Sequence, residues 1–105
     1  MTERQLKSLI LEFLNLHQAV DIALPYNQIQ ASKTARRSKW QPTGIPDIVG
    51  NMGNGISLYV EVKLPQGRVS KAQDEFIISR LKRGSVAFVA RSVQDCEIAL
   101  ANFGY

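Results

Sequence analysis

The sequence has little cysteine and little histidine, with one of each among 105 residues. A single cysteine, Cys96, excludes an intramolecular disulfide and a zinc site built from cysteines, and it fits an intracellular, cytoplasmic protein. His17 lies just beyond the first expected helix, where a solvated or helix-terminal position is favoured over a catalytic one. We therefore predict neither a cysteine-based zinc site nor a histidine-based triad.

Long hydrophobic runs and glycine-rich phosphate loops are also lacking. The longest early apolar run covers residues 9–11 and is followed at once by Glu12, so neither a signal peptide nor a membrane span is predicted. Gly53 and Gly55 precede an expected strand rather than opening a helix, which argues against nucleotide hydrolysis. We expect no membrane partner.

Composition and charge indicate one globular domain with a polyanionic partner. Hydrophobic residues make up 45% and charged residues 21%, which is close to the average for globular proteins. A length of 105 residues allows a single domain, expected over residues 1–105. The formal net charge of +4 and the pI near 9.5 suit a partner such as DNA.

The cations are concentrated in two segments. Residues 63–83 carry six cations against two acids. Residues 33–39, KTARRSK, carry four cations and no acid, and we expect them to contact phosphate, with a solvated surface loop as the alternative. These four cations are Lys33, Arg36, Arg37 and Lys39. Trp40 follows them, and packing against the sheet is favoured for it over stacking on a base.

Apolar spacing and capping residues predict elements in the order αβββαβα. The first helix is predicted over residues 3–16. The second begins at a capping box of Ser70 and Gln73 and ends at residues 82–84. The third begins after its cap, Ser92. Strands are predicted over residues 20–24, 46–50, 56–63 and 85–91, with a long loop over residues 26–45. This order predicts an α/β (α+β) fold with one mixed sheet flanked by helices.

The predicted helices rest on apolar residues at helical spacing, which are expected to face the core. They are Leu6, Leu9, Ile10, Phe13, Leu14 and Leu16 in the first helix, Phe76, Ile77 and Leu81 in the second, and Cys96, Ala99, Leu100 and Phe103 in the last.

The strand predicted over residues 56–63 has an unusual polar face. Alternation places Tyr59, Glu61 and Lys63 on one side of this strand. A surface pair of Glu61 and Lys63, worth at most about 1 kcal/mol, is one explanation. Tyr59 shares the face without an obvious chemical task.

A second carboxylate favours a functional explanation. Residues 51–55, NMGNG, predict an antiparallel hairpin centred on Gly53, which places Asp47 opposite Tyr59 and diagonal to Glu61. Two such carboxylates can converge on one Mg²⁺ ion. A slip of the register by one residue would instead send Asp47 to the opposite face.

Two carboxylates beside a lysine suit the hydrolysis of a phosphodiester bond. Asp47 and Glu61 would hold a metal ion that lowers the pKa of a water molecule and offsets charge in the transition state. Lys63 would orient the attacking water or stabilise the developing charge. The backbone carbonyl of Val62 is a plausible further ligand, because hard cations accept carbonyl oxygens.

These motifs resemble a known family. GIPDIVG at residues 44–50, followed by VEVK at residues 60–63, resembles the PD-(D/E)xK nuclease signature. Together with VEVKLPQGRVSKAQDEF and RLKRGSVAFVARSVQD, these motifs make nearly the whole chain similar to the VRR-NUC domain, in the small stand-alone form typical of phages and prophages. The resemblance implies a mixed sheet flanked by helices, Mg²⁺ or Mn²⁺ as cofactor and branched DNA as substrate.

The resemblance also implies roles for individual residues. Asp47, Glu61 and Lys63 match the two acids and the lysine of the motif, and Glu3 matches a further glutamate better than Glu12 does. Glu3 could bind a second metal directly or through water, or merely complement the dipole of the first helix.

Residues on and before the second helix are matched as well. Gln73 matches a glutamine of the family's site, although its capping role competes for the same side chain. Arg68, Ser70 and Lys71 are expected to contact phosphate, with a solvated turn and a plain helix cap as the alternative.

The expected function is therefore a metal-dependent, structure-selective DNA endonuclease that resembles Holliday-junction resolvases and acts as a homodimer. A non-catalytic DNA-binding module is one alternative, and a nuclease directed to flaps or nicks is the other.

Overall fold

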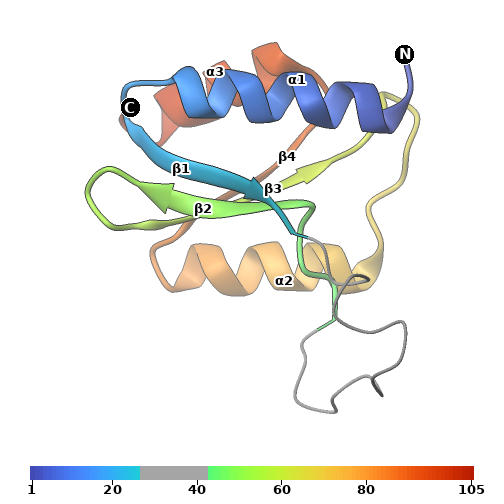
Figure 1. Cartoon of the computed structure of the whole chain (residues 1–105). Helices are drawn as coiled ribbons and strands as arrows, with labels where there is room; N and C mark the ends of the chain where they lie inside the picture. The colour runs from blue at the N-terminus through green and yellow to red at the C-terminus, as the bar shows by residue number, and fades with distance from the viewer. Residues whose placement is uncertain (27–42) are drawn as a thin grey trace, which may run out of the picture.

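The computed structural model describes residues 1–26 and 43–105. The predicted order αβββαβα is confirmed (Figure 1). Its elements are α1 (Glu3–Leu16), β1 (Val20–Pro25), β2 (Ile48–Met52), β3 (Ser57–Val62), α2 (Lys71–Lys82), β4 (Val86–Ala90) and α3 (Val93–Asn102). Lys33, Arg36, Arg37, Lys39 and Trp40 lie outside the described residues, so their expected roles stay predictions.

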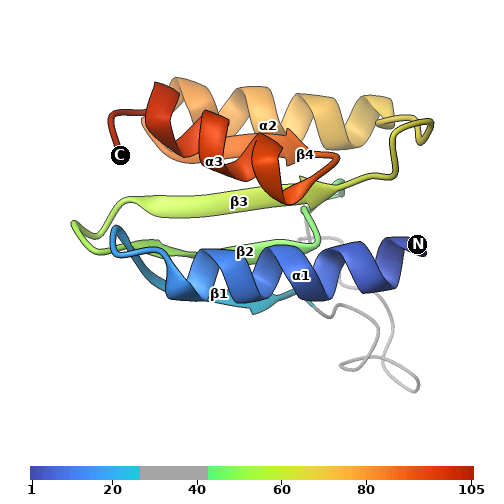
Figure 2. The same cartoon turned by 90° about the horizontal axis from the view of Figure 1, so that it is seen from above.

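The four strands form one mixed sheet, as predicted. Their order in the sheet is β1-β2-β3-β4. The β1–β2 and β2–β3 pairs are antiparallel, and the β3–β4 pair is parallel. Helices α1 and α3 cover one face of the sheet and α2 covers the other (Figures 1 and 2). The beginnings of α1 and α2 and the ends of β1 and β3 all lie at the same end of the molecule, which the two views show consistently.

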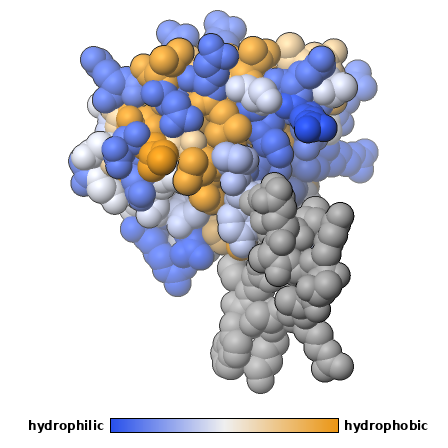
Figure 3. Space-filling view, in the orientation of Figure 1, coloured by the Kyte–Doolittle hydropathy of each residue, from blue (hydrophilic) through white to orange (hydrophobic). Residues whose placement is uncertain are grey.

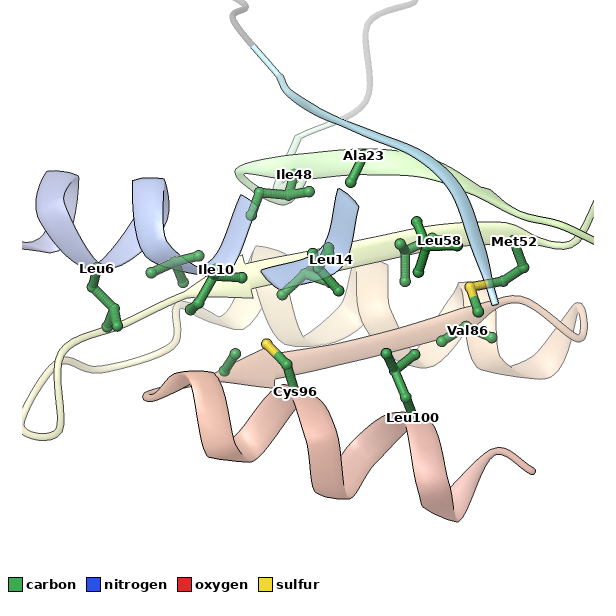
Figure 4. Packing of buried hydrophobic residues seen from close by; sticks show 14 residues of the cluster. Leu6, Ile10, Leu14, Ala23, Ile48, Met52, Leu58, Val86, Cys96 and Leu100 are labelled. Atoms are coloured by element: carbon green, nitrogen blue, oxygen red, sulfur yellow. The ribbon is translucent and has the colours of Figure 1, made fainter. Parts of the chain in front are cut away.

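The hydrophobic core lies between the sheet and the helix pair α1 and α3 (Figure 4). Ile10 and Leu14 of α1, Leu58 of β3 and Leu100 of α3 are fully buried there. Burying an aliphatic side chain of this size stabilises the fold by about 1.5–3 kcal/mol. This layer therefore fixes α1 on the sheet.

Four of the apolar helix positions expected in the core are exposed. The exposed fractions are 43% for Leu9, 78% for Leu16, 42% for Leu81 and 39% for Phe103. A helix lying on a sheet buries only a stripe, so apolar residues at the margins of the stripe or in the last turn stay in contact with water.

The register of the β2–β3 hairpin differs from the prediction by two residues. Ile48 pairs with Val60 and Gly50 with Leu58, because the tight loop covers residues 53–55 and is centred on Asn54. Gly55 adopts a φ of +90°, the left-handed conformation that three-residue hairpin loops require. A shift of two keeps the same residues on each face, so Asp47 still shares the face of Glu61.

No helix in the described part of the chain is both long enough and apolar enough to span a membrane.

Candidate active site

Asp47 is held between the neighbouring strands at the start of β2. The Val62 N–H donates to Asp47 Oδ2 at 3.0 Å, and the Tyr26 N–H donates to the Asp47 carbonyl oxygen at 2.7 Å. Continuing the register one step beyond the Ile48–Val60 pair places Asp47 directly opposite Glu61. The two carboxylates are thus closer than the diagonal arrangement expected from the sequence.

Gly44 brings the segment before Asp47 against α2. Its φ is +76°, and a Cβ atom at this position would lie 2.3 Å from the carbonyl oxygen of Ala72. Only glycine fits such an approach. The GIPD motif therefore packs on the first turn of α2, next to Gln73.

Glu61 is a buried acid on the α2 side of the sheet. Its side chain is 2% exposed, and it is the one buried charged residue in the described part of the chain. Gln73 Nε2 donates to Glu61 Oε2 at 3.2 Å. An acid this deeply buried calls for a functional explanation, because burying a carboxylate is unfavourable unless a partner compensates its charge.

The side chain of Gln73 both caps α2 and contacts Glu61, two roles that the sequence analysis treated as alternatives. Its Oε1 accepts from the Ser70 N–H at 2.9 Å, while the Ser70 hydroxyl accepts from the Gln73 N–H at 3.1 Å. Its Nε2 remains free to contact Glu61. The capping box thus orients the amide that reaches the buried carboxylate.

The surroundings of Glu61 raise its pKa from 4.5 to about 8. Burial is the largest cause, followed by the negative charge of Asp47 and a hydrogen bond between the two carboxyl groups. The charge of Lys63 lowers the pKa of Glu61, and the charge of Glu3 raises it. Both charged groups therefore lie near Glu61.

The two candidate acids of α1, Glu3 and Glu12, occupy different positions. Glu3 begins α1, as expected, and among the described acids, histidines and cysteine no three side chains are grouped tightly enough to form a metal site. A metal contact through Glu3 thus stays a prediction. Glu12 lies about two and a half turns further along α1 and lines a separate hollow with Met1 and Leu9, so Glu3 is the better candidate.

The predicted phosphate contacts gather at the start of α2. Ser70 is the N-cap of this helix, Arg68 is exposed, and Lys71 forms a loose exposed ion pair with Glu75 at 3.9 Å. His17 is the C-cap of α1, at the opposite end of that helix from Glu3.

Two arginines that the sequence analysis did not single out shape the surroundings. Arg80 lies over the ring of Phe76 at 4.6 Å and near that of Tyr59 at 5.7 Å, which gives Tyr59 a packing role between β3 and α2. Arg91 Nη1 donates to the carbonyl oxygens of Leu64, Pro65 and Gly67 at 2.7–3.2 Å. No local sequence pattern marks Arg91, because its partners are backbone carbonyls.

The donor set fits a divalent cation that prefers oxygen ligands. Two carboxylates meet at a buried position, where their mutual repulsion and desolvation are relieved if a cation lies between them. The ammonium group of Lys63 thus lies near the two acids, Asp47 and Glu61.

Comparisons with known proteins agree with this geometry. The VRR-NUC domain family matches residues 1–94. A solved structure described as a VRR-NUC domain protein has a similar fold, with a TM-score of 0.68 and 18% sequence identity over 98% of this chain and 88% of that chain. A comparison with curated protein sequences gave no match.

The family consists of nucleases, which hydrolyse DNA and typically depend on a metal ion. Matched over nearly its whole length, the chain belongs to the VRR-NUC domain family.

Proposed function

We propose that the chain is an Mg²⁺- or Mn²⁺-dependent endodeoxyribonuclease of the PD-(D/E)xK type, and that it cuts branched DNA such as a Holliday junction. One observation carries the proposal. Asp47 lies opposite the buried Glu61 across two paired strands. Lys63 follows directly after β3, and its charge acts on the Glu61 carboxyl group.

Each residue of the site has a task in phosphodiester hydrolysis. Asp47, Glu61 and the carbonyl oxygen of Val62 would hold the metal ion, with Glu3 contributing directly or through water. When bound, the ion supplies positive charge to the phosphoryl oxygens and lowers the pKa of the attacking water. Lys63 orients that water or stabilises charge that develops on the phosphate, and Gln73 fixes the carboxylate of Glu61.

The partners follow from the substrate. Arg68, Ser70 and Lys71 would contact phosphates at the start of α2, where backbone N–H groups also favour anions. Resolving a four-way junction requires two symmetric cuts, so we propose a homodimer that supplies two active sites.

A cleavage assay tests the proposal. Labelled four-way junction, flap, single-stranded and duplex DNA are incubated with the protein in Mg²⁺, Mn²⁺ or chelator, beside Lys63→Ala. We expect paired symmetric cuts in the junction that disappear with chelator and in the variant. Binding without cleavage in either metal would instead identify a DNA-binding module, and preferential cutting of flaps would identify a flap nuclease.

A further inference from the structure

A groove lies beside the proposed active site. It lies between the first turns of α1 and the end of β1, and its volume is about 550 Å³. The lining residues are Glu3, Arg4, Lys7, Ser8, Leu11 and Pro25. Residues 4, 7, 8 and 11 follow the spacing i, i+3, i+4, i+7, so one face of α1 forms the wall of the groove.

The groove is built from fixed elements and leads to the carboxylates. Asn15 exchanges two hydrogen bonds of 2.9 Å with the backbone of Ala23, which ties α1 along β1. Pro25 lies at the end of β1, and the next residue, Tyr26, donates its N–H to the carbonyl of Asp47 at 2.7 Å. One end of the groove therefore adjoins the residue that begins the proposed metal site.

The groove carries two cations, Arg4 and Lys7, against one acid, Glu3. Arg4 is exposed and Lys7 is half-buried. Within residues 1–26 and 43–105, the ion pair observed is that of Lys71 with Glu75, so neither Arg4 nor Lys7 is paired with an acid there. The surface over the first turns of α1 is mostly hydrophilic, whereas an apolar band crosses the middle of the molecule (Figure 3).

This groove differs from the other hollows along α1. A neighbouring hollow is lined by Met1, Leu6, Leu9, Leu64 and Pro65 together with Arg91, Ser92 and Val93. Its wall is mainly apolar, and the guanidinium of Arg91 is engaged with backbone carbonyls. The groove near Pro25 has two cations that form no ion pair within the described residues, the Ser8 hydroxyl and one acid, Glu3. Its net charge is therefore positive, which suits an anionic chain.

We propose that this groove binds the sugar–phosphate backbone of the DNA strand beside the cleaved bond, with Arg4 and Lys7 on its phosphates. This proposal rests on the proposed nuclease function and adds a second set of contacts. Arg68 and Lys71 lie just before and at the start of α2, which covers the opposite face of the sheet from α1 (Figure 1). Glu61 lies on β3 of that sheet, near its end. A strand that crosses this end of the sheet meets both sets of cations.

The test compares two double variants with the same change of charge. Arg4→Gln/Lys7→Gln removes one arginine and one lysine from the groove, and Lys82→Gln/Arg83→Gln removes the same pair from the far end of α2, about 18 Å along the helix. Glutamine keeps helix propensity high, so both variants are expected to fold. Both double variants are made in an Asp47→Asn background, so that the DNA is not cut during the measurement. Their affinity for labelled four-way junction and duplex DNA is measured between roughly 50 and 200 mM salt, where phosphate contacts make the affinity strongly dependent on salt.

At about 0.1 M salt, we expect the groove variant to lose about tenfold in DNA affinity for each phosphate contact that is removed. The slope of log affinity against log salt concentration should become less steep by about 2. The far-end control should bind like the parent. Equal losses in the two variants, or no loss in the groove variant, would overturn the proposal.

A phosphate-neutralisation experiment locates the contact. Single methylphosphonates are placed on either side of the cleaved bond, and their effect on affinity is compared in the parent and the groove variant. A substitution that weakens the parent but not the variant is the expected result, because the contact is already lost. Additive losses at every position would contradict the assignment.

The outcomes separate this proposal from the one on which it rests. If the wild-type chain cuts DNA while Arg4→Gln/Lys7→Gln binds like the parent, the groove proposal fails and the nuclease function stands. If the wild-type chain neither binds nor cuts any DNA, both fail together.

Discussion

The Glu61 carboxylate is buried beside Asp47, and this environment raises its pKa to about 8. In the unfolded chain the pKa of this group returns to about 4.5. Between these two values the folded state therefore holds a proton that the unfolded state has lost. The free energy of unfolding of the metal-free protein should accordingly fall as the pH rises through this window.

Urea denaturation in the presence of chelator measures the free energy of unfolding of the wild type and of Glu61→Gln at about pH 5.5 and about pH 8. The variant has no proton to lose, so its stability should change less between the two pH values and should exceed that of the wild type at the higher one. Adding Mg²⁺ should recover stability in the wild type only. An identical pH dependence in the two proteins would contradict the environment assigned to Glu61.

Gln73 shares its capping role with a residue elsewhere in the chain. Gln5 forms the same reciprocal bonds with Thr2 at the start of α1, and it has no contact with Glu61. Gln73→Ala and Gln5→Ala should each lower the free energy of unfolding by about 0.5–1 kcal/mol through the lost cap. Gln73→Ala should lower it further, because it also leaves the buried Glu61 carboxyl without its donor.

Nuclease activity should distinguish these two variants. Only Gln73→Ala removes a hydrogen bond to the carboxyl group of Glu61, so it alone is expected to slow cleavage by about tenfold or more and to alter the pH profile. Rates measured at several pH values check this. Equal cleavage rates for the two variants would show that Gln73 acts only as a helix cap.

At the scale of elements, the loop between β3 and α2 connects Lys63 to the start of α2. Arg91 engages three of its backbone carbonyls, and the Arg91 N–H is itself fixed by a 2.8 Å hydrogen bond to Asp95 Oδ2 in the first turn of α3. The end of β4 thus holds the loop that carries Arg68. We regard Arg91 as a positioning residue for Lys63 and for the phosphate contacts.

Arg91→Ala should loosen this loop while the sheet stays intact. Trypsin cleavage after Arg68 should become faster, and nuclease activity should fall by about tenfold, because a misplaced group costs rate without changing the chemistry. Arg91→Lys should restore part of the activity, and the pH profile should not move. The matched control is Arg83→Ala, at the exposed C-cap of α2. Unchanged proteolysis at Arg68 would exclude the positioning role.

The sequence predicts the elements and the faces of this fold better than it predicts the contacts between them. Alternation along β3 correctly assigns Glu61 and Tyr59 to one face, because the side-chain period of a strand is independent of its partner. The register was wrong by two residues because it depends on the length of the turn, which the NMGNG segment leaves open.

Contacts between distant residues leave no local trace in the sequence. Arg91 reaches carbonyls 24 to 27 positions earlier in the chain, and any residue type offers such a carbonyl. The dual role of Gln73 also depends on how α2 is seated, which Gly44 determines through its contact with Ala72. The family motif indicated which residues meet, and the fold shows how they are held.

At the scale of the whole molecule, strands and helices converge at one end of a small sheet. The ends of β1 and β3 and the beginnings of α1 and α2 lie together there (Figures 1 and 2). Asp47 directly precedes β2 and Glu61 is near the end of β3, while the core lies along the other face of the sheet. The active-site end can therefore retain an unfavourably buried acid, because the stability of the fold comes from the aliphatic layer under α1 and α3.

The most direct test of this account is the rate at which Glu61→Gln cuts a labelled four-way junction in Mg²⁺ under single-turnover conditions, with folding verified on the same sample. We predict a variant that is at least as stable as the wild type at about pH 8 and cuts at least about 1,000-fold more slowly, because the acid is kept for metal binding and not for the fold. A folded Glu61→Gln protein that cuts the junction at the wild-type rate would contradict the account.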